Sequence, residues 1–136
     1  MNSSVWIDGC HFHGNSAVTG SDGSGGIGGG IFFTNCNASI SDTVFSENTA
    51  RHVNAVNANS GGGGLYFSGG VGSLTNCAFV NNFSNGWCGG LLASSCELLL
   101  ENCSFVNNEG VLGGGFYLQK GGSEVPAVAT LNNCTF

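Results

Sequence analysis

A fixed interval of 14 residues constrains the fold of this chain more than any other feature. It separates an apolar residue that follows two glycines from the next phenylalanine: Ile31 to Phe45, Leu65 to Phe79, and Leu91 to Phe105. The return interval, from each phenylalanine to the next glycine motif, varies between 11 and 20 residues. This combination is typical of a solenoid, because stacked strands keep their spacing whereas insertions collect in one turn.

Aligning the repeats on phenylalanine produces rows of similar residues at fixed offsets. The aligned residues are Phe12, Phe45, Phe79, Phe105 and Phe136. Three positions earlier stand Gly9, Asp42, Asn76, Asn102 and Asn133, and two positions earlier stand Cys10, Thr43, Cys77, Cys103 and Cys134. An Ile or Leu stands five positions before each phenylalanine. Like residues recur two positions apart within a repeat, which is the periodicity of a strand with one buried face.

These rows predict an all-β fold, a parallel β-helix of about four coils, each of 26–34 residues and three short strands. We expect strands after the glycines, around the Ile/Leu row and at Cys-x-Phe, with the Asn/Asp row at a sharp bend between the last two. Asparagine tolerates the left-handed backbone of such a bend, and its amide can bond the next coil. Stacked coils would form Phe, Cys and Asn ladders around a shared core. We expect residues 1–136 to be one segment of a longer solenoid.

The alternation of two motifs resembles a known repeat family. Phe-x-x-Asn occurs at Phe12–Asn15, Phe45–Asn48, Phe79–Asn82 and Phe105–Asn108, and the Gly-Gly-apolar motif lies between successive copies. This pattern resembles the repeat of chlamydial polymorphic outer membrane proteins, which also occurs in algal and protist surface proteins. The resemblance covers the whole chain. It implies a right-handed β-helix in a secreted or surface-displayed region, often an adhesive one.

Composition narrows the range of partners. The net charge is −6, and Arg51 and Lys120 are the only cations. Binding to nucleic acid is excluded as a main activity, because neutralising several phosphates needs clustered basic residues. No apolar run approaches the roughly 18 residues of a membrane-spanning helix.

Cysteines and histidines offer several hypotheses. The chain has seven cysteines and three histidines but no Cys-x-x-Cys pair, which disfavours a zinc site. Cys77, Cys103 and Cys134 fall on adjacent coils, where they are either free core thiols or disulfide partners. We expect Cys88, in a turn, to be exposed or paired with Cys96. His11 and His13 could share a metal ion or simply be solvated; we predict no cofactor and no metal.

Five Asn-x-Ser/Thr sequons are present, and those at Asn37 and Asn82 are the expected N-glycosylation sites. The sequons at Asn102 and Asn133 belong to the bend row, whose amides should already be bonded. Glycosylation would accompany an extracellular or cell-surface location.

The most suggestive functional feature is a predicted stripe on the first strand of each coil. The outward residues there are Phe32, Tyr66, Leu92 and Tyr117. A contiguous exposed apolar stripe usually marks a contact surface. Three hypotheses compete: a seam for another protein or copy, cover by the loops Val18–Gly28 and Arg51–Gly61, and stacking against a sugar.

Catalysis is the alternative to a structural role. Pectate-lyase-like enzymes use this architecture, but they need clustered carboxylates. Here Asp8 and Glu101 would share an outward row three coils apart, and no convergent group emerges. The sequence therefore favours a non-enzymatic structural or adhesive rod that associates with other copies, with neighbouring coils, or with a surface protein or glycan. The alternative is a carbohydrate-binding or polysaccharide-active β-helix.

Overall fold

The computed structural model describes residues 3–19, 26–53, 61–121 and 126–136. Over these ranges the chain forms strands and turns and no helix. The strands are β1 (Ser3–Asp8), β2 (His11–His13), β3 (Ser16–Thr19), β4 (Ile31–Ser41), β5 (Val44–Ser46), β6 (Thr49–His52), β7 (Leu65–Thr75), β8 (Ala78–Val80), β9 (Phe83–Ser84), β10 (Leu91–Glu101), β11 (Ser104–Val106), β12 (Phe116–Gln119) and β13 (Val128–Asn132).

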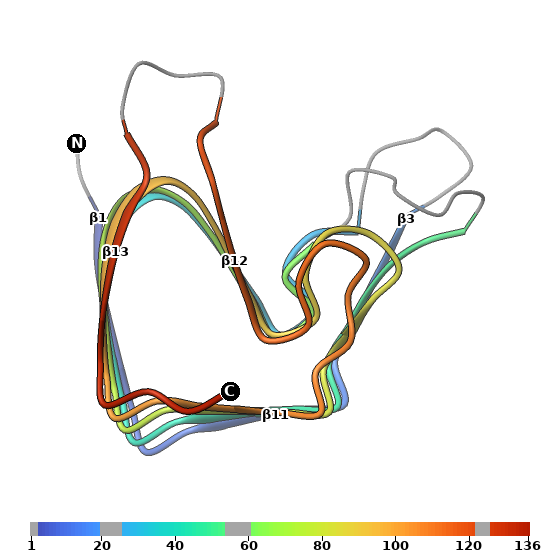
Figure 1. Ribbon diagram of the computed structural model, residues 1–136, viewed down its shortest axis with the longest axis horizontal. Helices are drawn as coiled ribbons and strands as arrows, with labels where there is room; N and C mark the ends of the chain where they lie inside the picture. The colour runs from blue at the N-terminus through green and yellow to red at the C-terminus, as the bar shows by residue number, and fades with distance from the viewer. Residues whose placement is uncertain (1–2, 20–25, 54–60, 122–125) are drawn as a thin grey trace.

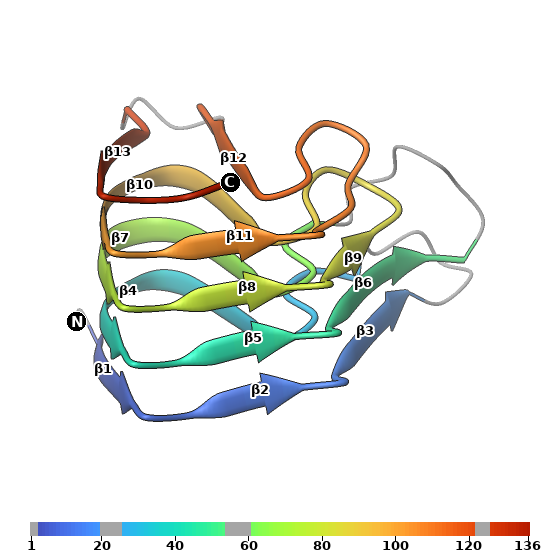
Figure 2. The same cartoon turned by 60° about the horizontal axis from the view of Figure 1, so that its bottom comes forward.

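The strands form three parallel sheets, as Figures 1 and 2 show. The first has the order β1-β4-β7-β10-β12, with β13 also paired to β10; the second is β11-β8-β5-β2 and the third β3-β6-β9. We call the stretch of chain that supplies one strand to each sheet a pass. Successive passes lie over one another in Figure 1 and separate in Figure 2. The predicted all-β class with stacked parallel strands is thus confirmed.

The register between passes pairs like residues. Phe12 lies opposite Phe45, Phe45 opposite Phe79, and Phe79 opposite Phe105. The phenylalanine rings stack at centroid distances of 4.8–5.2 Å with interplanar angles of 11° or less, and Phe136 continues the row. Because each ring covers the next, the apolar area is buried between passes rather than within one.

The strand division differs from the predicted three short strands in two respects. The segments after the glycines and around the Ile/Leu row are one continuous strand of 11 residues in β4, β7 and β10. The chain still turns within them, because Asn35, Gly69 and Ser95 adopt left-handed backbone angles while pairing resumes on either side. In addition, β3, β6 and β9 form a sheet after the Phe-x-x-Asn motif that the sequence did not predict.

Left-handed residues turn the chain at two corners of each pass. The first corner carries Gly9, Asp42, Asn76, Asn102 and Asn133, with φ between 47° and 58°. The second carries Gly14, Glu47, Asn81 and Asn107, each directly before the asparagine of Phe-x-x-Asn, with φ between 52° and 65°. Left-handed backbone is costly for most residues, which explains why asparagine and glycine dominate both corners.

The core lies between the first and second sheets. Its fully buried side chains include Phe45, Phe67, Phe79, Leu74 and Leu100. At the first pass Val5, Ile7 and Phe12 are only half-buried, since no described strand covers their far side.

Candidate functional site

The four residues of the predicted stripe lie in one line across the first sheet. Phe32 pairs with Tyr66, Tyr66 with Leu92, and Leu92 with Tyr117. The rings of Phe32 and Tyr66 stack with centroids 5.1 Å apart. Phe32 is 41% exposed, and both tyrosines are half-buried.

Leu92 breaks this stripe, and the prediction of a contiguous exposed surface is corrected there. The side chain is only 1% exposed. Gly61 lies against it: a β-carbon on Gly61 would stand 2.5 Å from Leu92 Cδ2. Part of the cover therefore comes from the turn before β7, at the end of the loop Arg51–Gly61. The loops Val18–Gly28 and Arg51–Gly61 fall partly outside the described residues.

Glycine is required in the turns before β4 and β7, where each turn approaches a stripe residue. Gly28 and Gly62 have φ of 66° and 64°. A β-carbon at Gly28 would lie 2.7 Å from Phe32 Cβ, and one at Gly62 would lie 2.8 Å from Tyr66 Cβ. The glycine motif thus lets each turn pass directly beside a stripe residue.

A row of hydrogen-bonded asparagines runs through the second corner, and its two middle members, Asn48 and Asn82, are buried. The sequence reasoning missed this row. It consists of Asn15, Asn48, Asn82 and Asn108, the last residues of the Phe-x-x-Asn motifs. The Asn48 amide nitrogen donates to Asn82 Oδ1 at 3.0 Å, and the Asn82 amide nitrogen donates to Asn108 Oδ1 at 2.9 Å. The signal was the motif itself, because its asparagine keeps the same distance from phenylalanine in each repeat.

The position of Asn82 in this row of asparagines contradicts its predicted glycosylation. Its side chain is 1% exposed, and its amide nitrogen also donates to the carbonyl of Phe45 at 2.8 Å. With both amide hydrogens bonded inside the fold, the nitrogen has no room for a glycan. Asn37, the other expected acceptor, is exposed on the outer face of β4.

The asparagines of the first corner form a second, exposed row. The Asn76 amide donates to Asp42 Oδ1 at 3.0 Å, Asn102 donates to Asn76 at 3.2 Å, and Asn133 donates to Asn102 at 2.8 Å. Each bond links one pass to the next at the surface. The sequons at Asn102 and Asn133 therefore have their amides in use.

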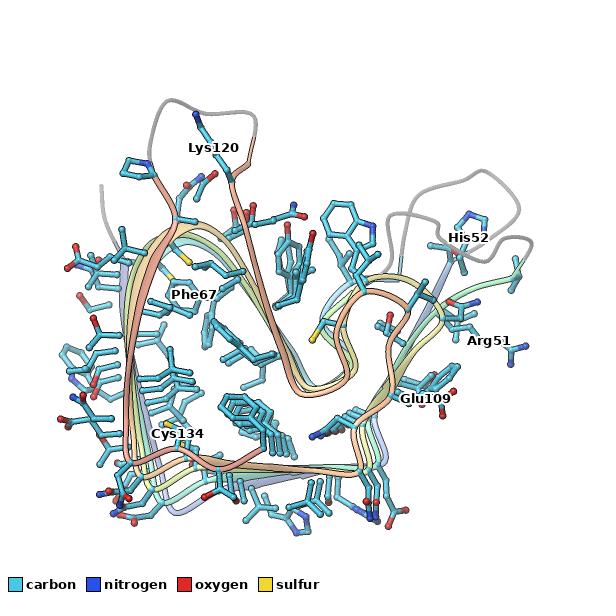
Figure 3. All side chains as sticks on the ribbon, in the orientation of Figure 1. Arg51, His52, Phe67, Glu109, Lys120 and Cys134 are labelled. Carbon is cyan, nitrogen blue, oxygen red and sulfur yellow. The ribbon has the colours of Figure 1, made fainter. Side chains whose placement is uncertain are left out.

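The cysteines of the described chain are free thiols. Cys77 and Cys103 lie on adjacent passes: a hydrogen bond with the Cys103 side chain lowers the pKa of Cys77, while the Cys77 side chain and burial raise that of Cys103. Their neighbour Cys134 is half-buried and bonds the Leu100 carbonyl. These three sulfurs fill the corner beside the phenylalanine row, where Figure 3 shows Cys134.

Cys88 corrects the expectation of an exposed or paired cysteine. It is fully buried, and its sulfur donates to the carbonyls of Leu91 and Gly114. Burial raises the pKa of Cys88 to about 12 and that of Cys96 to about 11. Both thiols therefore remain protonated at neutral pH and act as small core side chains.

The two histidines of β2 meet at one serine hydroxyl. His11 Nε2 and His13 Nδ1 lie 2.6 and 2.9 Å from the hydroxyl of Ser46, which joins the two rings. In the described ranges no group of three or more His, Cys, Asp or Glu could hold a metal ion. Figure 3 places Arg51 and Lys120 at separate corners of the fold. The described part of the chain also contains no helix long and apolar enough to span a membrane.

An outer furrow, which the sequence reasoning also missed, lies on the far side of the first sheet from the core. We define it by six outward residues of β1, β4 and β7: Ser4, Trp6, Asn37, Ser39, Val71 and Ser73. Its volume is about 340 Å³, and Trp6, one of the six, is 78% exposed. Continuing the strand alternation outward from Ile7 would have placed Trp6 on this face.

No family model, no curated protein and no solved structure matches this chain. Functional conclusions therefore depend on the geometry of its own residues.

Proposed function

We propose that the chain is a segment of a right-handed parallel β-helix of about four coils, and that it serves as a structural, adhesive rod at a cell surface or outside the cell. The proposal extends the stacked parallel sheets to a continuous solenoid. Its handedness and its location are supported by the resemblance of the Phe-x-x-Asn and Gly-Gly-apolar repeat to surface proteins. We propose no catalytic role.

The observation that carries this proposal is the open edge of the first pass. Strands β1, β2 and β3 are edge strands whose described partners, β4, β5 and β6, all lie on one side. Phe12 stacks on Phe45 with one face, and Val5 and Ile7 beside it are half-buried. Unpaired strand edges above an uncovered core favour the addition of further strands. The expected partner is a coil of the same kind, from another copy or from a longer solenoid.

The stripe provides a second, smaller contact surface in this proposal. It is limited to Phe32, Tyr66 and Tyr117, because Leu92 is buried. The stacked pair of Phe32 and Tyr66 offers an aromatic contact on the side of the rod.

Sedimentation velocity over a range of concentrations tests the edge. The isolated chain should form species larger than the monomer as concentration rises, and Phe12→Lys should abolish them by placing a charge in the open edge. His13→Lys, on the outward side of the same strand, is the matched control and should associate normally. A wild-type chain that stays monomeric, or a Phe12→Lys variant that associates like wild type, contradicts the proposal.

Tyr66→Ser and Tyr117→Ser separate the stripe from the edge. If these variants associate less while circular dichroism shows an intact fold, the stripe contributes to the contact. If both variants associate as strongly as wild type, the stripe is not a contact surface and the edge alone mediates association.

A further inference from the structure

The outer furrow combines an exposed indole with uncharged polar side chains. Alternation along β1 and β4 sends Val5 and Ala38 toward the core, and Gly72 of β7 has no side chain, so the floor between the two outward rows is backbone. One outward row consists of Ser4, Asn37 and Val71; the other consists of Trp6, Ser39 and Ser73. Both rows run along the direction in which the strands stack.

The furrow continues beyond these three strands. An adjoining hollow of about 330 Å³ shares Val71 and Ser73 and is completed by Glu97, Leu99 and Thr130 on β10 and β13. Since neighbouring parallel strands are about 4.8 Å apart, the two hollows together offer a path across several strands. Such a path suits an extended chain molecule lying parallel to the stacking axis.

The chemistry of the first hollow limits what can bind there. Its outward side chains carry no charge: they are three serines, one asparagine, one valine and the exposed indole of Trp6. A phosphate-bearing or otherwise anionic ligand would find no cation, and the net charge of −6 would repel it. A purely apolar ligand would leave the hydroxyl and amide groups without partners.

A sugar ring can contact both the apolar indole and the polar side chains of this surface. One face of a pyranose presents C–H groups, which pack against the π face of an indole, and its rim presents hydroxyls. Ser39 and Ser73 stand in the same row as Trp6, and Asn37 faces them across the floor. Their donors and acceptors can bond the hydroxyls of a ring that lies on Trp6.

The furrow remains accessible even if the open edge is occupied. A strand that paired with β1 would lengthen the sheet in its own plane and would leave the outer face uncovered. Binding at the furrow and association through the edge are therefore separate events with separate tests.

We propose that the outer furrow binds a neutral oligosaccharide, with Trp6 as the stacking platform and Asn37, Ser39 and Ser73 as hydrogen-bonding groups. This goes beyond the proposed structural role, because it assigns a ligand class to one face of the rod.

The test uses Trp6 as its own reporter. The chain has two tryptophans, so Trp87→Phe leaves Trp6 as the sole indole. This variant is titrated at millimolar sugar with hexamers of β-1,4-linked glucose, N-acetylglucosamine and mannose, and with hexagalacturonate as the acidic comparison. At least one neutral hexamer should change the fluorescence saturably, and hexagalacturonate should bind at least tenfold more weakly.

Calorimetry with the same hexamer then identifies the surface. Trp6→Ala should weaken binding at least tenfold and Trp6→Phe less, whereas Phe32→Ala, an exposed aromatic on another part of the first sheet, should bind like wild type. Circular dichroism should show the same fold in both Trp6 variants, because Trp6 is mostly exposed.

Three outcomes overturn the proposal. The first is no saturable change with any neutral hexamer, and the second is equal affinity of Trp6→Ala and wild type. The third is self-association that Trp6→Ala abolishes in sedimentation, which would make the furrow a contact between copies. If only Phe12→Lys loses association, this result supports the edge contact and does not affect the proposal for the furrow.

Discussion

Two rows of asparagines link the same passes of this chain, yet they differ in burial and in the number of their bonds. Asn82, in the second corner, is buried, and its side chain makes four hydrogen bonds, to the Asn48 backbone and side chain, to the Phe45 carbonyl and to Asn108. Asn76, in the first corner, is exposed and makes one bond to each neighbour in its row.

The difference shows that one residue type serves two separate needs. In the first corner the backbone needs a left-handed residue, and Asn76 has φ of 54°. In the second corner Asn81 supplies the left-handed angle, and Asn82 follows it with its amide turned into the fold. There the side chain satisfies backbone groups that would otherwise be buried without partners.

The largest effect should follow from removing the buried amide. Asn82→Leu keeps a similar volume but leaves the Phe45 carbonyl and the Asn48 donors without their partner. Because each orphaned buried group costs about 1–3 kcal/mol, we expect the free energy of unfolding to fall by about 3 kcal/mol or more. Urea unfolding followed by circular dichroism measures this loss.

Asn48→Leu is the matched test at the neighbouring pass, where the amide makes the same set of bonds. It should cost less than Asn82→Leu, because Asn15 is exposed and Phe12 half-buried, so water can replace part of the lost bonds. A loss below about 1 kcal/mol in either variant would show that the buried row is not a structural requirement.

Sequence reasoning could predict the first row but not the second. A residue that tolerates left-handed backbone at a fixed position before a strand indicates a bend, and this local signal holds for Asp42, Asn76 and Asn102. The role of Asn82 depends on a carbonyl 37 residues earlier in the chain, which only the stacked register brings into reach. Its sequon instead suggested a glycan. Burial of Leu92 likewise depends on Gly61, in the turn of another pass.

Alkaline pH should destabilise the fold by a separate route that leaves both asparagine rows intact. Burial raises the pKa of Cys96 to about 11 and that of Cys88 to about 12, whereas an unfolded thiol titrates near 8.5. Above about pH 9 the unfolded chain has released these protons and the folded chain retains them. Stability should therefore be constant below this pH and fall as pH rises toward 11.

Unfolding measured from pH 7 to 10.5 checks this window. Cys88→Ala and Cys96→Ala should each flatten the decline, even though each lowers stability at pH 7. Asn76→Ala should leave the slope unchanged, because amides do not titrate there. Cys77 and Cys103 have pKa values shifted in opposite directions, so their contributions oppose each other. An unchanged slope in both cysteine variants would assign the decline to other groups.

The exposed row should lose less than the buried one when an amide is removed. Asn76→Ala keeps a β-carbon at φ of 54° and removes two surface hydrogen bonds. Left-handed backbone costs alanine about 1–2 kcal/mol, and we expect a destabilisation of this size in urea unfolding. A loss as large as that of Asn82→Leu would mean that the two rows are equivalent.

Glycine at the same corner separates the backbone need from the side-chain bonds and should have the smallest effect. Asn102→Gly removes the bonds to Asn76 and Asn133 but adopts φ of 53° without steric cost. Its net cost should be about 0.5 kcal/mol, mainly from the added freedom of the unfolded chain, and Asn102→Ala should cost more. If the glycine variant is instead the less stable of the two, the surface amide bonds, rather than the backbone angle, select asparagine in the first corner. Gly9, which occupies this corner in the first pass at φ of 58°, fits the backbone explanation.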